Sequence, residues 1–294
     1  MEENNVNLFV VGAMKAGTTS FIDMLSQHSQ IYVSPVKEPH YFVNSLPENL
    51  YEPSRFFSLE EYLKKKFPEP LHITKVESSQ QYSKIYVLAG KELYKVDGST
   101  AYLHAPESAK LIYDYNPEAK IIIILRNPLQ RAYSHYKMNL GKGRTKQSFE
   151  NEIQQDIEAY QNGIQAWYSY LGMSLYKAAV DRYKQLFTNV LVIRFEDLIL
   201  KEQEVLSEVS AFLNINSFPD RQYAHKNTGK ELRFQKLFYF LKKLGLKDYF
   251  SKIFSSNFRQ FLFKIFSKRK AKNLELSSTI KTKLEDIFTK ESNV

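Results

Sequence analysis

Cysteine is absent from the 294 residues of this chain, and the few histidines show no pair at the spacing of metal ligands. The missing thiols exclude disulfide frameworks, zinc fingers, iron–sulfur clusters and cysteine nucleophiles. Long apolar runs are lacking too, since no window approaches the roughly 18 residues of a membrane span. The amino terminus starts with acids before a short apolar run, which is unlike a secretory signal. We therefore expect a soluble protein of the cytoplasm that needs no structural metal.

No Gly/Ser linker and no internal repeat divides the sequence. Its hydrophobic content of 43% is enough for one large α/β domain or two small ones. We predict a single domain over residues 1–294. Within it, residues 44–86 are rich in aromatics, proline and charge, and we expect them to form an insertion or lid. Residues 232–294 have a helical and basic pattern.

Positive charge is concentrated towards the carboxy terminus. The net charge is +9, yet residues 226–272 alone hold 14 Lys and Arg against two acids. Eleven aromatics are interleaved with these cations between Phe234 and Phe266, and core packing is the plainest interpretation of that pattern. The functional interpretation is contact with an anionic glycan or an anionic membrane. Nucleic acid is not expected, because no nucleic-acid motif is present.

Short apolar runs mark the strands of the predicted fold. Three of them, at 8–11, 119–125 and 189–195, are apolar throughout, which indicates a sheet covered on both faces. A shorter strand is expected at 31–33. The first run leads through a glycine-containing loop into residues 18–28, whose apolar positions have helical spacing. Strand, loop and helix in this order predict an α/β fold with a parallel sheet flanked by helices.

The loop after the first strand has the composition of an anion site. It reads Gly12-Ala13-Met14-Lys15-Ala16-Gly17-Thr18-Thr19-Ser20. A loop between a strand and a helix offers free backbone N–H groups and the positive end of the helix dipole. Gly17 lets the backbone approach a ligand closely, Lys15 adds a full positive charge, and three hydroxyls follow.

A second cation, Arg126, ends the strand at 119–125. Asn127 and Pro128 follow as a good N-cap and first helical residue. Because parallel sheets bind ligands at the carboxyl ends of their strands, Arg126 can hold a second anion. This pattern argues against a nucleotide kinase or NTPase. Their loop needs a lysine where Thr18 stands, and a metal-binding aspartate is expected where the chain has Arg126.

Together these motifs resemble the sulfotransferases that use 3′-phosphoadenosine 5′-phosphosulfate (PAPS). The segment 15–20 resembles their 5′-phosphosulfate loop, and the segment 126–134 resembles their 3′-phosphate site. Supporting likenesses are Lys37 to Phe42, Gly172 to Tyr176 and Arg194 to Leu198. The resemblance spans about residues 6–213 and implies a sulfotransferase domain with a P-loop-like parallel sheet.

The resemblance also implies roles for individual residues. The 5′ end of PAPS would be held by Lys15, Ala16, Gly17, Thr18, Thr19 and Ser20. Arg126 and Ser134 would hold the 3′-phosphate. Gly229 and Lys230 correspond weakly to a further donor-binding loop and are candidates. Lys15 would also stabilise the charge on the departing oxygen in an in-line displacement that releases 3′,5′-ADP without a metal.

The acceptor must lose a proton as it attacks, so a general base is expected nearby. In the heparan-sulfate branch of the family a glutamate aligned with Glu38 takes this role, and the Glu-x-His-x-Phe spacing is kept here. In the cytosolic small-molecule branch a histidine from another segment does so. We predict Glu38 as base, with His40 supporting or orienting it, and the choice between the two stays open. Gly98 stands where the heparan-sulfate enzymes have a lysine, which speaks against a heparan-like acceptor.

The predicted function is transfer of a sulfuryl group from PAPS to a hydroxyl or amine, with a carbohydrate or glycoconjugate as the favoured acceptor. A lipid-linked glycan, a tyrosine or a small alcohol stay open as acceptors. A nucleotide kinase or NTPase and a non-catalytic nucleotide-binding module are the alternative hypotheses. Retention of Lys15 and Glu38 argues against the binding module.

Overall fold

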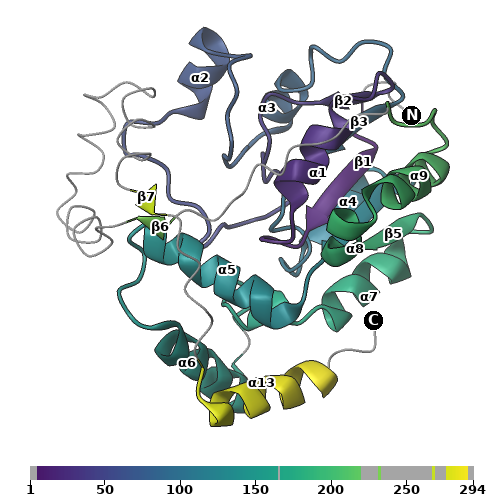
Figure 1. Ribbon diagram of the computed structural model, residues 1–294. Helices are drawn as coiled ribbons and strands as arrows, with labels where there is room; N and C mark the ends of the chain where they lie inside the picture. Colours follow the sequence, from purple (N-terminus) through teal and green to yellow (C-terminus); the bar gives the residue numbers. More distant parts are fainter. Residues whose placement is uncertain (1–4, 165, 220–230, 233–266, 269–275, 291–294) are drawn as a thin grey trace.

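A parallel sheet forms the centre of the computed structural model, which describes residues 5–164, 166–219, 231–232, 267–268 and 276–290 (Figure 1). Its five strands have the order β2-β3-β1-β4-β5, and every neighbouring pair is parallel. The strands are β1 (Leu8–Gly12), β2 (Ile31–Val33), β3 (Tyr94–Asp97), β4 (Lys120–Leu125) and β5 (Val190–Arg194). The predicted α/β class with a parallel sheet is confirmed.

The two strands at the middle of the sheet are also the most deeply buried. All residues of β1 and the four isoleucines of β4 are buried, as expected for apolar strands covered on both faces. β5 lies at the edge of the sheet and is only partly buried. The sheet therefore presents a rigid centre at the β1–β4 pair, and the two predicted anion-binding loops follow these two strands.

Helices cover the sheet on both sides. The chain passes from β1 outward to β2 through α1, and it passes in the opposite direction from β3 to β4 and from β4 to β5. Right-handed crossovers place helices of these two directions on opposite faces. In agreement, α4 and α7 pack against each other, while α8 and α9 contact β5. The helices are α1 (Thr18–Leu25), α4 (Ser108–Tyr115), α7 (Lys177–Leu186), α8 (Phe195–Leu200) and α9 (Glu202–Leu213).

A second hydrophobic cluster lies beside the sheet. It is formed by α5 (Pro128–Gly141), α6 (Phe149–Gln161) and α13 (Ser278–Lys290), with the short helix η1 (Gly172–Ser174) near α5. α13 lies along α6 in Figure 1 and contributes Ile280, Leu284 and Ile287 to the cluster. Helix α13 thus packs in the cluster beside the sheet, which also includes Leu129 and Ala132 of α5.

Most predicted elements are found close to their expected bounds. The strand at 31–33 is confirmed, and α5 begins as predicted, with the Asn127 side chain accepting a hydrogen bond from the Gln130 N–H and Pro128 in the first turn. The predicted helix to Leu213 is interrupted at Lys201, between α8 and α9. β3 was not predicted, because its residues Tyr94-Lys95-Val96-Asp97 lack an apolar run.

The two irregular segments differ from expectation in part. Residues 44–86 contain two short helices, α2 (Leu59–Lys65) and α3 (Ser79–Lys84); their role as insertion or lid stays a prediction. The helical pattern from residue 232 onward is wrong at two places, since β6 (Glu231–Leu232) pairs antiparallel with β7 (Ser267–Lys268). A pairing of two residues each is held by backbone hydrogen bonds, and it is too short to produce a periodic pattern in the sequence. The helix is confirmed at α13, and the other basic, aromatic residues of 226–272 lie outside the described ones.

Candidate active site

Parallel strands end at one edge of the sheet, and the candidate residues follow these strand ends. The loop 12–20 follows β1, and Arg126 follows β4, the neighbour of β1. Glu38 and His40 lie beyond β2, while Ser99 and Thr100 lie beyond β3. The topology therefore gathers residues from four segments at one rim of the sheet.

The loop after β1 leads into a helix whose start has no side-chain cap. Gly17 precedes α1 with a left-handed φ of 86° and gives the helix no side-chain cap. Lys15 also has a positive φ, 74°. The left-handed region suits glycine and is uncommon for lysine, so the loop is held in a special conformation. An uncapped helix start with a lysine beside it is suited to an anion.

Phe195 connects the loop to Arg126. A Cβ atom at Gly17 would lie 2.6 Å from the Phe195 ring, so the glycine backbone sits directly on that ring. The Arg126 guanidinium lies over the same ring, 4.7 Å from its centroid. Arg126 Nη1 also donates a hydrogen bond of 3.1 Å to the Lys15 carbonyl. The structure thus brings Lys15 and Arg126 together at the β1–β4 edge.

Lys15 is half-buried, and other cations lie near its ammonium. Burial lowers its pKa, and the neighbouring Arg126 lowers it further, whereas the charge of Glu38 raises it. The positive charges near the Lys15 ammonium therefore outweigh the single negative charge of Glu38. An anionic ligand placed between Lys15 and Arg126 would relieve their mutual repulsion.

Glu38 is held in a network that reaches the loop. Its Oε2 accepts a hydrogen bond of 2.9 Å from the Thr100 hydroxyl, and its Oε1 lies 3.1 Å from the Lys37 ammonium. The same Lys37 ammonium donates to the Thr19 hydroxyl at 2.7 Å. Burial favours the neutral acid, but Lys37, His40 and the Thr100 hydrogen bond outweigh it, so the pKa of Glu38 lies below its usual value. Glu38 is therefore ionised at neutral pH.

His40 lies directly behind this carboxylate. Its Nε2 is 3.6 Å from Glu38 Oε2, and its Nδ1 lies 3.1 Å from the Glu38 carbonyl and 3.3 Å from that of Thr74. Two carbonyls around Nδ1 favour the tautomer with the proton on that nitrogen. Burial lowers the pKa of His40, although Glu38 opposes this. His40 is only 2% exposed, and in this tautomer its Nε2 carries a lone pair, so the neutral ring donates no hydrogen bond to the Glu38 carboxylate.

The position of Gly98 is filled by a neighbour. A Cβ atom there would lie 2.1 Å from the Ile22 side chain, so any larger residue requires Ile22 to move. A lysine at this position would require a new rotamer of Ile22. The Lys37 ammonium, on the segment after β2, is instead the cation in contact with Glu38.

Buried bonds fix the helix that follows Arg126. Arg131 is fully buried in α5 and donates to the Ser174 hydroxyl at 2.7 Å and to the Tyr170 carbonyl at 2.6 Å. The Tyr176 hydroxyl donates to the Arg126 carbonyl at 3.0 Å. The segment around η1 thus anchors the start of α5, and Ser134 lies half-buried in the second turn of that helix. No hydrogen bond between described residues joins Ser134 to Arg126.

Two predicted donor-binding residues lie outside the described part, and two site residues were not predicted. Gly229 and Lys230 lie outside the described residues. Within the described part, no three His, Asp or Glu side chains are grouped as metal ligands, and no helix has the length and apolarity to cross a membrane. Sequence reasoning missed Lys37 and Thr100 as members of the site, although both lie in segments that carry the resemblance.

Comparison with known proteins places the chain in a family. Residues 7–220 match the model of the Sulfotransferase family, and the chain belongs to that family. Carbohydrate sulfotransferase 15 of Mus musculus is 21% identical over 257 residues, covering 74% of this chain and 45% of the relative. Heparan sulfate glucosamine 3-O-sulfotransferase 5 of Homo sapiens is 27% identical over 210 residues, covering 70% of this chain and 52% of the relative.

A solved structure has a similar fold over nearly the whole chain. The crystal structure of a sulfotransferase from Alicyclobacillus acidocaldarius is 25% identical, has a TM-score of 0.59, and matches 97% of this chain and 96% of its own. This similarity agrees with the P-loop-like parallel sheet. The chain spans about half the length of the two curated relatives described above.

Proposed function

We propose that the chain is a single sulfotransferase domain that transfers a sulfuryl group from PAPS to a hydroxyl or amine of a carbohydrate or glycoconjugate. The observation that carries the proposal is the convergence of Lys15, Arg126 and Glu38. Arg126 bonds to the Lys15 backbone, and Lys37 joins Glu38 to Thr19 of the same loop. Family membership supports the reaction class.

Two anion-binding elements support PAPS as donor. The uncapped start of α1, with Lys15 and the hydroxyls of residues 18–20, suits the 5′-phosphosulfate. Arg126 and Ser134, at the end of β4 and on α5, suit the 3′-phosphate. Since Arg126 and Lys15 touch, one ligand with charges at both ends can engage the two elements together.

Glu38 is assigned as general base. Its carboxylate accepts the proton of the acceptor hydroxyl or amine as the acceptor atom bonds to sulfur and the bond from sulfur to the 5′-phosphate oxygen breaks. Lys15 stabilises the negative charge left on that oxygen, and 3′,5′-ADP departs. Lys37 holds Glu38 and Thr19 together, so it aligns the base with the loop. A supporting role of His40 requires a proton on Nε2, because only then can the ring donate to the carboxylate.

A carbohydrate acceptor is the class that the relatives favour. Both curated relatives described above carry carbohydrate or heparan sulfate in their names. Gly98 stands where the heparan-sulfate enzymes have a lysine, and Lys37 is a cation in contact with Glu38, so a heparan-type acceptor is not assumed.

Donor binding is tested by thermal shift. Stabilisation by 3′,5′-ADP in the absence of magnesium is expected, because both anion-binding elements use side-chain and backbone N–H groups alone. Stabilisation by magnesium-ATP instead would favour the nucleotide kinase or NTPase, and stabilisation by neither would contradict the donor site.

The base is tested by transfer of label from sulfur-labelled PAPS to a panel of saccharides, a tyrosine peptide and small alcohols. Glu38→Gln should lower the transfer rate about 10²–10⁴-fold while keeping the affinity for 3′,5′-ADP. Glu118→Gln, at an exposed glutamate, is the matched control and should behave as wild type. Transfer by Glu38→Gln at the wild-type rate would remove Glu38 as base.

A further inference from the structure

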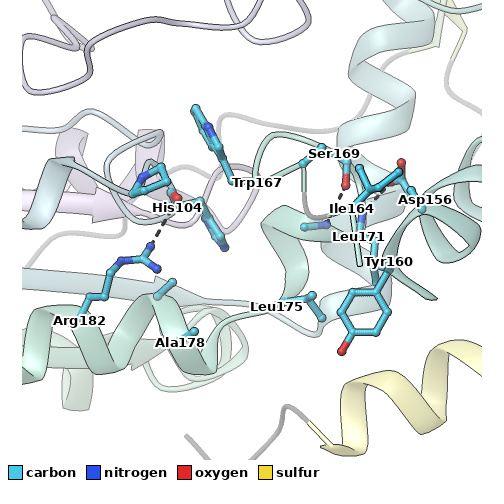
Figure 2. A pocket seen from close by; sticks show the side chains of 15 residues that line it. His104, Asp156, Tyr160, Ile164, Trp167, Ser169, Leu171, Leu175, Ala178 and Arg182 are labelled. Carbon is cyan, nitrogen blue, oxygen red and sulfur yellow. Dashed lines mark hydrogen bonds between the residues drawn. The ribbon is translucent and has the colours of Figure 1, made fainter. Parts of the chain in front are cut away.

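A separate pocket opens between α6, α7 and the segment that follows β3. Its volume is about 260 Å³, and its lining includes His104, Tyr160, Ile164, Trp167, Leu175 and Arg182 (Figure 2). None of the candidate donor or base residues lines it. At about 30 Å³ per water, the volume corresponds to eight or nine waters, which is room for one sugar ring.

His104 contributes an unsatisfied polar group to the pocket wall. Its ring is 4% exposed, and neither ring nitrogen makes a hydrogen bond of normal geometry. The Leu175 backbone acts on the ring only weakly, and burial together with Arg131 and Arg182 lowers the pKa of His104 to about 3. The ring is thus neutral at physiological pH, with one donor and one acceptor. A buried pair of this kind is suited to a ligand hydroxyl.

Arg182 brings a charge that the described residues leave unbalanced. Its Nη2 donates to the carbonyls of Leu103 and His104 at 3.1 and 3.4 Å, and the second of these bonds is drawn in Figure 2. Its Nε is buried without a partner. No ion pair joins Arg182 to an acid in the described part of the chain. Because a guanidinium stays charged, an anionic group is the natural partner.

The rest of the lining gives the pocket two unlike ends. Trp167, Leu175 and Ile164 provide an apolar wall. Asp156 lies on the opposite side from Arg182 in Figure 2, and its carboxylate accepts a hydrogen bond of 2.8 Å from the Leu171 N–H. Asp156 repels a ligand carboxylate at its end of the pocket. A ligand that carries a carboxylate is therefore oriented with that carboxylate towards Arg182. A sugar ring, with apolar C–H faces and a polar rim, fits walls of this composition.

We propose that this pocket binds a sugar unit that carries a carboxylate, one of the units flanking the sulfated position of the acceptor. The carboxylate pairs with Arg182, a hydroxyl pairs with His104, and the ring lies against Trp167. This inference rests on the proposed carbohydrate acceptor.

The chain links the pocket to the base. Thr100, which bonds to Glu38, is four residues from His104, so their Cα atoms are at most about 15 Å apart. The segment that continues from Glu38 also reaches the pocket rim, where Asn49 donates to the Tyr168 carbonyl at 3.0 Å. The pocket therefore lies within the length of a short oligosaccharide from the segment that bonds to Glu38.

Trp167 provides a direct readout, because it is the only tryptophan of the 294 residues. With 3′,5′-ADP at saturation, sodium glucuronate and a glucuronate-containing disaccharide should change its fluorescence in a saturable way. Glucose should act only at much higher concentration, and inorganic sulfate alone should not reproduce the change. An equal response to glucose, or a full response to sulfate alone, would overturn the carboxylate-bearing sugar as ligand.

Arg182→Gln should weaken the glucuronate response about ten-fold, the effect of losing one hydrogen bond to a charged group. Lys184→Gln removes a charge from an exposed position of the same helix and should leave the response unchanged. Equal weakening by both variants would contradict a specific site. Transfer to glycans with no Trp167 response would overturn the pocket and leave the proposed function standing. A Trp167 response without any transfer would support the pocket and contradict the function.

Discussion

Substitution of Gly17 by alanine tests whether Phe195 couples the two anion-binding elements. Alanine at φ 86° costs about 1–2 kcal/mol of backbone strain. The added Cβ atom would lie 2.6 Å from the Phe195 ring, and overpacking of this kind costs about 1–3 kcal/mol. Because the Arg126 guanidinium lies over that ring, a displaced Phe195 ring would also displace Arg126. We expect a total loss of about 2–5 kcal/mol in stability, with at least about ten-fold weaker binding of 3′,5′-ADP.

Gly163 supplies the matched control. It has a similar φ of 76°, but nothing lies within 4 Å of an added Cβ atom. Gly163→Ala should therefore lose only the strain energy, about 1–2 kcal/mol, and bind 3′,5′-ADP as wild type. The assays are urea unfolding and calorimetric titration with 3′,5′-ADP. Equal losses of stability and unchanged nucleotide affinity in both variants would refute the coupling through Phe195.

Two further predictions concern buried ionisable groups. Lys37→Met removes the main positive neighbour of Glu38, so the pKa of Glu38 should rise and the acid limb of the pH–rate profile should move to higher pH; an unmoved limb contradicts this. Burial raises the pKa of Asp97 to about 6 from 3.8, so stability from its protonated form is present below pH 3.8 and is lost as pH rises through 6. The stability advantage of wild type over Asp97→Asn should accordingly fall by about 3 kcal/mol between pH 3 and pH 7 in urea unfolding, and a constant difference would disprove the assignment.

Local patterns were enough to predict the centre of the fold. The strands before Gly12 and Arg126 are buried on both faces, so each is a continuous apolar run that the sequence displays directly. The cap of α5 was equally visible, because Asn127 and Pro128 act within one turn. Sequence patterns thus predicted the elements that are stabilised mainly by their own residues.

Elements that depend on distant partners were missed. β3 contains the polar Lys95 and Asp97, and Asp97 is stable there because hydroxyls of Tyr82 and Tyr102 bond to it. Lys37 joins the site only because the fold brings its ammonium to Thr19, 18 residues away in sequence. Pairings of this kind leave no periodic signal, so the network around Glu38 emerged only from the three-dimensional structure.

The position of α13 has a practical consequence for work with shortened forms of the chain. The family match ends at residue 220, but the second hydrophobic cluster is completed by three side chains from beyond that point, Ile280, Leu284 and Ile287. A fragment cut at the homology boundary would leave the apolar face of α6 open to water, at a loss on the order of 5 kcal/mol. A shortened form that is intended to be stable should therefore extend beyond residue 220 and include α13.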